Sequence, residues 1–434
     1  MIESREAVAG IIGLGYVGLP LAAAVARGGF RVLGFDIDES KVELINAGTS
    51  YIEAVPTEDL AAHVTAGKLR ATGDFSELAQ CDVIVICVPT PLSKQREPDL
   101  RFVVNTAQII ARHLREGQLV VLESTTYPGT TEEVVKPVLE EGGLRSGQDF
   151  FLAFSPERED PGNAKFRTTT IPKVVAGEGP SASALVEAFY GAVVERVVVV
   201  SSPSTAEAVK ITENVFRAVN IALVNELKVI YQAMGIDVWE VIGAAATKPF
   251  GFMPFYPGPG LGGHCIPIDP FYLTWKSREF GLPTRFIELA GEINVSMPRY
   301  VIGNLERAID ARHGKSLGSS KILIIGLAYK KNVPDIRESP AFVLIELLEQ
   351  RGTKVDYFDP YVPEVPVTRE HAALAGRRSV ELTAETIAGY DAILIATDHD
   401  NIDYGLIDTH ASLIVDTRNV LDNRGYRSDK IVKT

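Results

Sequence analysis

Three glycines near the N-terminus lie between a short apolar strand and an alanine-rich segment. The run 7–12 is expected to be a buried strand, and Gly13-Leu14-Gly15-Tyr16-Val17-Gly18 joins it to a helix. A strand, a G-x-G-x-x-G turn and a helix begin a βαβ unit whose helix N-terminus receives a pyrophosphate. Gly13 allows the tight turn, Gly15 lets the backbone approach the ligand and Gly18 permits close helix–strand packing. The motif therefore restricts this part of the chain to a doubly wound α/β fold that binds a dinucleotide.

A carboxylate after the second predicted strand indicates which dinucleotide is bound. Asp36 follows a second predicted strand, 30–35, and lies 21 residues after Gly15. A carboxylate there accepts hydrogen bonds from ribose hydroxyls and repels a 2′-phosphate, which favours NAD over NADP. The alternative is a glycine turn with an ordinary surface aspartate. The residues expected to bind NAD are Gly13, Gly15, Tyr16, Val17, Gly18, Asp36, Lys41, Thr90 and Thr125.

Composition excludes several classes of protein. The 434 residues, 46% hydrophobic and 23% charged, indicate a soluble globular chain of two or three domains. A net charge of −13 argues against nucleic-acid binding, and three cysteines argue against a disulfide scaffold. No apolar run is long enough to span a membrane, and no signal peptide is evident. We expect a cytoplasmic protein with no membrane partner and no metal site.

The order of predicted elements divides the chain into three parts. Strands and helices alternate through 1–202, which predicts a Rossmann-type NAD domain with a mostly parallel sheet. In 203–314, Ser204 and Glu207 suggest a capping box for a long central helix, about 45 Å at 1.5 Å per residue. A second helical piece, 283–313, is expected to be interrupted by Pro298. The alternation restarts in 315–434, which predicts a second Rossmann-like domain, and the long helix suggests a dimer core.

Three predicted strand ends carry polar sequences. They are Val88-Pro89-Thr90-Pro91, Glu123-Ser124-Thr125-Thr126 and Ser155-Pro156-Glu157-Arg158. Because ligands of open α/β sheets bind beyond the carboxyl ends of the strands, Thr90 and Thr125 are expected to face the cofactor. Glu157 and Arg158 are expected to face the substrate. Each sequence is equally compatible with turn formation or helix capping.

A cysteine in a glycine-rich loop indicates covalent chemistry. The run Gly258-Pro259-Gly260-Leu261-Gly262-Gly263-His264-Cys265-Ile266-Pro267-Ile268-Asp269-Pro270 leaves the thiol open to a ligand, whereas Cys81 and Cys87 belong to an apolar core. A thiolate adds to an aldehyde, and the resulting thiohemiacetal can be oxidised to a thioester and hydrolysed. With NAD, this predicts oxidation of an alcohol to a carboxylate by four electrons.

Three polar side chains are candidates to assist that chemistry. Asp269 could polarise the hydrolytic water, although Asp-Pro is also a typical helix start. Lys210 and Asn214 lie four apart, on one face of the long helix, where they could stabilise an alkoxide and hold a water. A solvated surface lysine is the alternative for Lys210. His264 is expected to be structural.

The motifs resemble those of the UDP-glucose/GDP-mannose dehydrogenase family over essentially the whole chain. The matching runs are Gly13-Leu14-Gly15-Tyr16-Val17-Gly18-Leu19-Pro20, Gly262-Gly263-His264-Cys265, Gly326-Leu327-Ala328-Tyr329-Lys330 and Asp335-Ile336-Arg337-Glu338-Ser339-Pro340. The resemblance implies an NAD domain, a central dimerising helix and a nucleotide-sugar domain. It also implies oxidation of a sugar C6 hydroxymethyl to a carboxylate with two NAD.

The resemblance assigns roles to individual residues. Cys265 is similar to the thioester nucleophile, Lys210 to the oxyanion-stabilising lysine and Asp269 to the water-activating aspartate. Asn214, Glu157 and Thr125 resemble the remaining catalytic residues, and Arg337 resembles a residue that reaches the cofactor. The implied substrate-binding residues are Glu157, Arg158, Lys210, Asn214, Tyr256, Gly260, Lys330 and Arg418.

Departures from the family pattern concern the sugar. Enzymes for UDP-glucose typically carry Ser and Lys where this chain has His264 and Ile268, and Lys248 is the only basic residue in 244–256. The loop looks most like the branch that oxidises UDP-N-acetylhexosamines, particularly UDP-N-acetyl-D-glucosamine. Alternatives are UDP-N-acetylmannosamine or UDP-glucose as substrate, a two-electron β-hydroxyacid dehydrogenase, and a non-catalytic nucleotide-sugar sensor.

Overall fold

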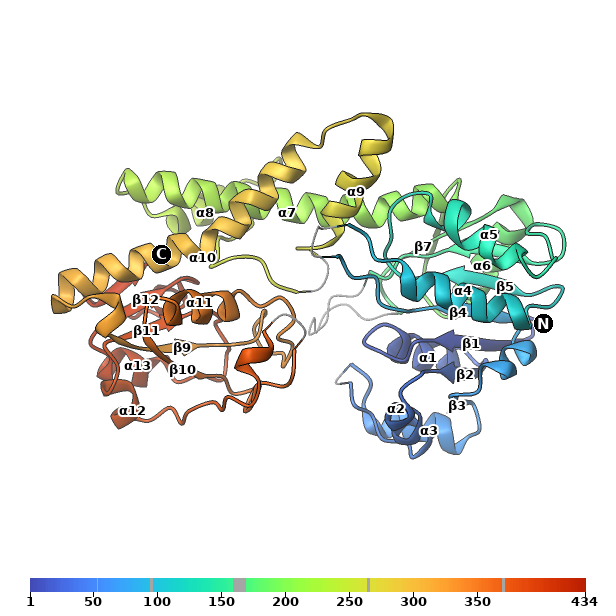
Figure 1. Cartoon of the computed structure of the whole chain (residues 1–434), viewed down its shortest axis with the longest axis horizontal. Helices are drawn as coiled ribbons and strands as arrows, with labels where there is room; N and C mark the ends of the chain where they lie inside the picture. The colour runs from blue at the N-terminus through green and yellow to red at the C-terminus, as the bar shows by residue number, and fades with distance from the viewer. Residues whose placement is uncertain (53, 94–96, 159–168, 264–265, 369–370) are drawn as a thin grey trace. The chain divides into compact units, whose positions relative to one another are not determined.

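The computed structural model describes residues 1–434 apart from 53, 94–96, 159–168, 264–265 and 369–370. The described chain forms two compact units, one of residues 1–213 and 271–283, the other of residues 214–270 and 284–434. Figure 1 shows an α/β unit at each end of the chain, each with helices covering its sheet.

The first unit contains an eight-stranded sheet in the order β3-β2-β1-β4-β5-β6-β7-β8. Its strands are β1 (Val8–Ile12), β2 (Arg31–Phe35), β3 (Leu69–Thr72), β4 (Val83–Ile86), β5 (Leu119–Leu122), β6 (Phe151–Phe154), β7 (Lys173–Gly177) and β8 (Val197–Val199). The first six pair in parallel, whereas β7 is antiparallel to β6. The order 3-2-1-4-5-6 is that of a dinucleotide-binding sheet, and it confirms the predicted doubly wound fold.

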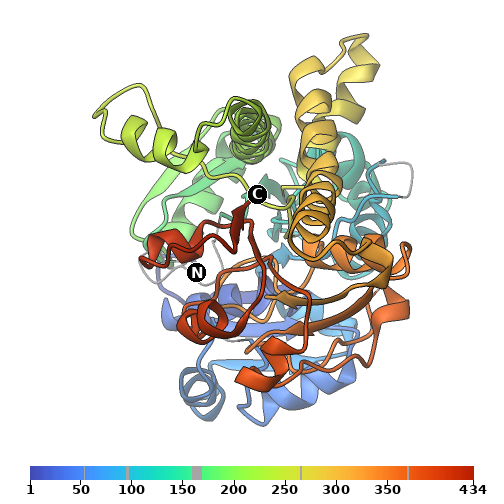
Figure 2. The ribbon, with the colours of Figure 1, turned by 90° about the vertical axis from the view of Figure 1, so that its left-hand side faces the viewer.

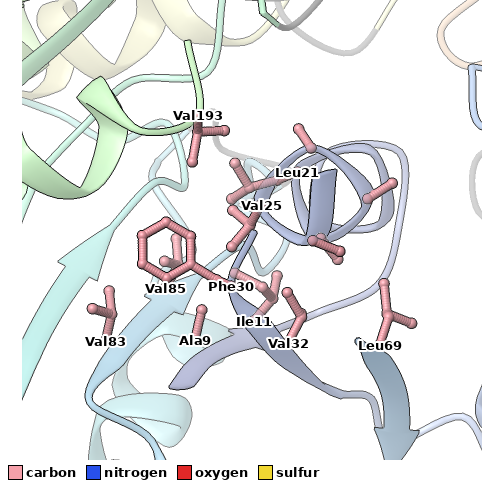
Figure 3. Packing of buried hydrophobic residues seen from close by; sticks show 14 of the residues in the cluster. Ala9, Ile11, Leu21, Val25, Phe30, Val32, Leu69, Val83, Val85 and Val193 are labelled. Atoms are coloured by element: carbon pink, nitrogen blue, oxygen red, sulfur yellow. The ribbon is translucent and has the colours of Figure 1, made fainter. Parts of the chain in front are cut away.

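Helices cover both faces of this sheet, so its strands are buried on both sides. The helices are α1 (Gly18–Arg27), α2 (Glu39–Asn46), α3 (Thr57–Thr65), α4 (Arg101–His113), α5 (Lys136–Glu140) and α6 (Gly179–Gly191). Along β1, Ala9 and Ile11 belong to one apolar cluster, and Val8 and Ile12 belong to the cluster on the opposite face. Figure 3 shows Ile11 beside Val25 of α1 in the first cluster. Complete burial of such side chains stabilises the fold by about 1.5–3 kcal/mol each.

The second unit contains a five-stranded parallel sheet in the order β10-β9-β11-β12-β13. Its elements are β9 (Lys321–Ile325), α11 (Pro340–Glu349), β10 (Lys354–Phe358), α12 (Ala384–Ala388), β11 (Ala392–Ile395), α13 (Tyr404–His410), β12 (Ile414–Asp416), α14 (Val420–Asn423) and β13 (Ile431–Lys433). This confirms the second Rossmann-like sheet.

The two sheets share one structural detail at the first strand. In the first unit the backbone N–H of Leu14 donates to Asp36, which follows β2. In the second unit the N–H of Leu327 donates to Asp359, which follows β10. Gly13 and Gly326 precede these donors with φ of 88° and 85°. Each sheet thus begins with an equivalent turn that is held by an aspartate after the neighbouring strand.

Two long helices lie between the sheets in the sequence. They are α7 (Pro203–Ala233) and α10 (Arg285–His313), and α8 (Val238–Ala245) and α9 (Asp269–Ser277) lie between them along the chain. Figure 2 looks almost down the axis of α7. Asn294 of α10 joins α7 by donating to the carbonyl of Ala218 at 3.1 Å and accepting from Asn225 at 2.9 Å.

Two predictions about these helices are wrong. The helix α10 is continuous through Pro298, which is buried in it together with Met297 and Val301. Tertiary packing therefore outweighs the single hydrogen bond that proline removes. Ser204 and Glu207 do not form a capping box, because Ser204 donates to Glu132.

The start of α7 is instead capped by Ser202, whose hydroxyl accepts from the backbone N–H of Thr205 at 3.1 Å. Glu207 accepts from the backbone N–H groups of Gly129 and Thr131 at 2.5 and 2.9 Å, and thus anchors the loop after β5 to α7.

Candidate active site

The glycine turn has the space and the strain that the motif requires. A Cβ on Gly13 would lie 2.5 Å from the carbonyl oxygen of Cys87, and one on Gly18 would lie 1.8 Å from that of Gly13. A Cβ on Gly15 would meet nothing within 4 Å, so this backbone is open on its outer side. Val17 provides no side-chain cap for α1. The free N–H groups at such a helix start suit a pyrophosphate.

Asp36 lies where the ribose-binding carboxylate was predicted. It is 7% exposed, and it holds the glycine turn by accepting from Leu14 N at 2.9 Å. Its other oxygen accepts from Asp38 N at 3.0 Å, and Lys41 Nζ lies 3.4 Å from the carboxylate. The residues present thus fit NAD. Tyr16, half exposed, stands in the same loop.

Thr90 and Thr125 meet beyond the carboxyl ends of the neighbouring strands β4 and β5. The hydroxyl of Thr90 donates to the carbonyl of Thr125 at 2.7 Å. Tyr272 of α9 is fully buried and donates to the carbonyl of Thr90. These bonds fix the loops after β4 and β5 against each other, beside the glycine turn.

Glu157 belongs to a buried charged cluster, which we call the Lys173 cluster and define as Glu123, Glu157, Lys173 and Tyr190. Lys173 Nζ forms an ion pair with Glu123 and lies 3.3 Å from the Glu157 carboxylate. The hydroxyl of Tyr190 donates to Glu123 at 2.5 Å. Burial raises the pKa of Glu123, and Lys173 opposes that shift. The cluster places one cation between two carboxylates at the ends of β5 and β6.

Lys210 is a buried residue, not the solvated surface lysine of the alternative interpretation. It is 8% exposed, and its ammonium donates to the backbone carbonyl of Glu157. Two of the candidate site residues, Lys210 and Glu157, therefore lie together. A preorganised ammonium at this place can stabilise a developing alkoxide.

Arg158 has an internal role. Its guanidinium binds Glu213 at 2.5 Å and the carbonyl of Pro172 at 2.6 Å. These bonds hold the loop after β6 against α7. The predicted contact of Arg158 with substrate stays a prediction.

Asn214 and Asp269 form a buried hydrogen bond. Asn214 Nδ2 donates to Asp269 Oδ2 at 2.6 Å, and both residues are at most 3% exposed. Asp269 is also the first residue of α9, and its chemical role stays a prediction. An amide that donates to one oxygen of a carboxylate orients it to act on a water.

The two thiols that the structure describes, Cys81 and Cys87, pack with the apolar core, as the sequence predicted. Cys265 and its neighbour His264 lie outside the described residues. Burial raises the pKa of the Cys81 thiol to about 12, and it also raises the pKa of Cys87. Neither forms a thiolate near neutral pH, which leaves Cys265 as the candidate nucleophile.

The predicted nucleotide-sugar residues of the second unit lie around the glycine-rich loop and the strand ends. Arg418 follows β12 and donates to the carbonyl of Ala396 at 2.8 Å. A Cβ on Gly260 would meet Pro340 at 3.1 Å, and Tyr256 is exposed and stacks on Trp239. Lys330 is partly buried. Arg337, which was predicted to reach the cofactor, pairs with Asp335 at 2.6 Å.

The sequence did not point to the buried lysines Lys173 and Lys228, which are 5% and 3% exposed. Lys173 begins β7. Lys228 lies within α7. A lysine inside an apolar stretch is the only signal that the sequence offers for either.

Comparison with known proteins identifies the family to which the chain belongs. Three domain models of the UDP-glucose/GDP-mannose dehydrogenase family match: the NAD binding domain at residues 7–194, the central domain at 204–296 and the UDP binding domain at 323–423. The chain belongs to the UDP-glucose/GDP-mannose dehydrogenase family. Its cofactor is NAD, and it contains the UDP-binding domain of these nucleotide-sugar dehydrogenases.

Relatives within this family differ in their sugar. The chain is 37% identical to a UDP-N-acetyl-D-glucosamine 6-dehydrogenase of Pseudomonas aeruginosa over 391 residues, 90% of each chain. It is 35% identical to a UDP-N-acetyl-D-mannosamine dehydrogenase of Pyrococcus horikoshii over 418 residues, 95% of each. The structure of a UDP-N-acetylmannosamine dehydrogenase from Pyrococcus horikoshii superposes with a TM-score of 0.88 at 33% identity, covering 98% of each chain. None of the helices in the described parts of the chain is both long and apolar enough to cross a membrane.

Proposed function

We propose that this protein oxidises the C6 hydroxymethyl group of a UDP-N-acetylhexosamine to the carboxylate, with UDP-N-acetyl-D-glucosamine as its substrate. The observation that carries the proposal is the match to two UDP-N-acetyl-D-glucosamine 6-dehydrogenases, at 37% and 36% identity over 90% or more of this chain. His264 and Ile268 in the cysteine loop support the same branch. The product uronic acid would serve a surface polysaccharide.

The residues of the two units have distinct tasks in this proposal. NAD, when bound, accepts a hydride in each of two successive oxidations. Lys210 stabilises the alkoxide that forms when the C6 hydroxyl loses its proton, on the way to the aldehyde. Thr125 contacts the cofactor. The thiolate of Cys265 then adds to the aldehyde carbon, and loss of the second hydride converts the thiohemiacetal to a thioester.

Hydrolysis completes the sequence. A water held by Asn214 and polarised by Asp269 attacks the thioester carbon, the carbon–sulfur bond breaks, and the carboxylate and the free thiol form. The short bond between Asn214 and Asp269, at 2.6 Å, supports this division of labour. Glu157, whose backbone carbonyl accepts from Lys210, is the remaining residue of the proposed site.

A panel of UDP-sugars tests the choice of substrate. We expect the highest kcat/KM with UDP-N-acetyl-D-glucosamine, compared with UDP-N-acetyl-D-mannosamine, UDP-N-acetyl-D-galactosamine and UDP-glucose. A higher kcat/KM with UDP-N-acetyl-D-mannosamine would contradict this choice and would make that sugar the substrate. Cys265→Ser should form no acid, and normal turnover by this variant would remove the nucleophile from the mechanism.

A homodimer through α7 is part of the proposal. Phe216, Leu223 and Ile230 are spaced by seven residues and are 48%, 49% and 46% exposed. Seven-residue spacing places them on one face of the helix. An exposed apolar stripe on a long helix is typical of a face that a second copy covers.

A further inference from the structure

Lys228 is a buried lysine without a hydrogen-bond partner for its ammonium among the described residues. It lies in the second half of α7 and is 3% exposed. Burial, with Arg418 nearby, lowers the pKa of Lys228 to about 7, and Asp416 opposes that shift. An unpaired buried ammonium is costly to the fold. The presence of a lysine at this buried position therefore needs an explanation other than the stability of the fold.

The guanidinium of Arg418 lies in the same region and is held from one side only. Its Nε donates to the carbonyl of Ala396 at 2.8 Å, which fixes the plane of the group. Its Nη1 faces the glycine-rich loop, where a Cβ on Gly258 would come within 2.7 Å. Glycine at this position therefore lets the loop pass close to the guanidinium.

The acids near these two cations do not neutralise them by direct contact. Asp416 accepts from the backbone N–H of Arg418 at 2.9 Å and from that of Leu421 at 3.0 Å, so its oxygens serve the turn after β12. Asp398 is the other acid that acts on Arg418. No ion pair joins either carboxylate to Lys228 or Arg418 in the described part of the chain.

Asn225 brings the loop to the same face of α7. It lies one turn before Lys228, and its side-chain oxygen accepts from the backbone N–H of Gly258 at 3.1 Å. Asn225 is fully buried and is itself held by Asn294 of α10 at 2.9 Å. Lys228, Arg418 and Gly258 all lie in the second compact unit.

We propose that Lys228 and Arg418 together bind the diphosphate of the nucleotide sugar, so that Lys228 is a substrate-binding residue. The inference rests on the proposed function for the identity of the ligand as a UDP-sugar. Charge-assisted hydrogen bonds to phosphate oxygens would satisfy both cations. A diphosphate also favours the charged ammonium, so that binding raises the pKa of Lys228 and takes up a proton.

Calorimetric titration of the full-length protein with UDP tests this role. At pH 7.5, in two buffers of different ionisation enthalpy, the wild-type protein should take up a fraction of a proton as UDP binds. Lys228→Met should abolish the uptake and weaken UDP binding about 10- to 100-fold, the loss of a charge-assisted hydrogen bond. Lys228→Arg should retain affinity but lose the uptake, because arginine does not titrate.

Controls separate this result from misfolding. Lys354→Met, at an exposed position of β10, removes the same charge from the same unit and should leave affinity and uptake unchanged. The thermal midpoint of Lys228→Met should equal or exceed that of the wild type, because an unpaired buried amine is replaced by an apolar side chain.

Three results would overturn the inference. They are unchanged UDP affinity in Lys228→Met, proton uptake that persists in it, and inorganic phosphate binding as tightly as UDP with the same dependence on Lys228. UDP binding needs no turnover, so the proposed function can fail separately: Lys228-dependent UDP binding without oxidation of any UDP-sugar would refute the function alone.

Discussion

Replacement of Lys173 by methionine should make the stability of the first unit depend steeply on pH. Lys173 is 5% exposed and is the cation between Glu123 and Glu157. Its removal leaves Glu123, fully buried, with the hydroxyl of Tyr190 as its remaining hydrogen-bond donor within the cluster. Loss of one partner from a buried pair costs about 3–5 kcal/mol when the remaining charge stays ionised.

Protonation of Glu123 reduces this cost at low pH. Burial already raises the pKa of Glu123 while Lys173 lowers it, so the pKa rises further in the variant. A carboxyl whose pKa is raised in the folded state contributes stability that is present below about 4.3, its unfolded value. That contribution is lost as pH rises through the folded pKa. Lys173→Met should therefore be close to wild type at pH 5 and lose several kcal/mol by pH 8.

Urea unfolding of both proteins at pH 5 and pH 8 measures the effect. Lys173→Met combined with Glu123→Gln should recover most of the stability at pH 8, because the neutral amide needs no cation. In the single variant, kcat should also fall, since Glu157 loses the ammonium 3.3 Å away. Equal destabilisation at both pH values, or no rescue by the double variant, would refute this account of the cluster.

Four other substitutions give separable outcomes. Gly18→Ala should destabilise the NAD-free protein, because its Cβ would overlap the carbonyl oxygen of Gly13, whereas Gly15→Ala should keep the wild-type melting temperature and weaken NADH binding at least tenfold in a fluorescence titration. Asn214→Asp would set a second carboxylate against Asp269; we expect kcat to fall at least 100-fold with an intact fold by circular dichroism, and wild-type turnover would exclude the assigned water site. Leu223→Lys should convert a dimer to a monomer in sedimentation experiments, and an unchanged sedimentation coefficient would place the interface elsewhere.

The sequence predicted those parts of the fold that local patterns determine. The strand from Val8, the glycine turn and Asp36 follow from an apolar run, backbone strain and a fixed spacing, and the structure confirms them. The short edge strands β3 and β13 were not predicted, because four and three residues carry little periodicity. Pro298 was misleading because packing of α10, a long-range effect, outweighs a local preference for interruption.

The site divides in the same way. Lys210, Glu157, Asn214 and Asp269 could be named from motifs, and the hydrogen bonds of Lys210 to Glu157 and of Asn214 to Asp269 bring them together in pairs. Lys173 and Lys228 could not be assigned from the sequence. Lys173 is notable for its burial and for partners 16 or more residues away, and Lys228 for its burial without a hydrogen-bond partner among the described residues; only the folded chain reveals either.

The number of NADH molecules formed per molecule of limiting UDP-N-acetyl-D-glucosamine tests the central claim most directly. Because a thioester intermediate allows a second hydride transfer before release, absorbance at 340 nm should correspond to two NADH per sugar, with the uronic acid as the final product. One NADH per sugar and a released aldehyde would contradict four-electron oxidation and would indicate a two-electron dehydrogenase.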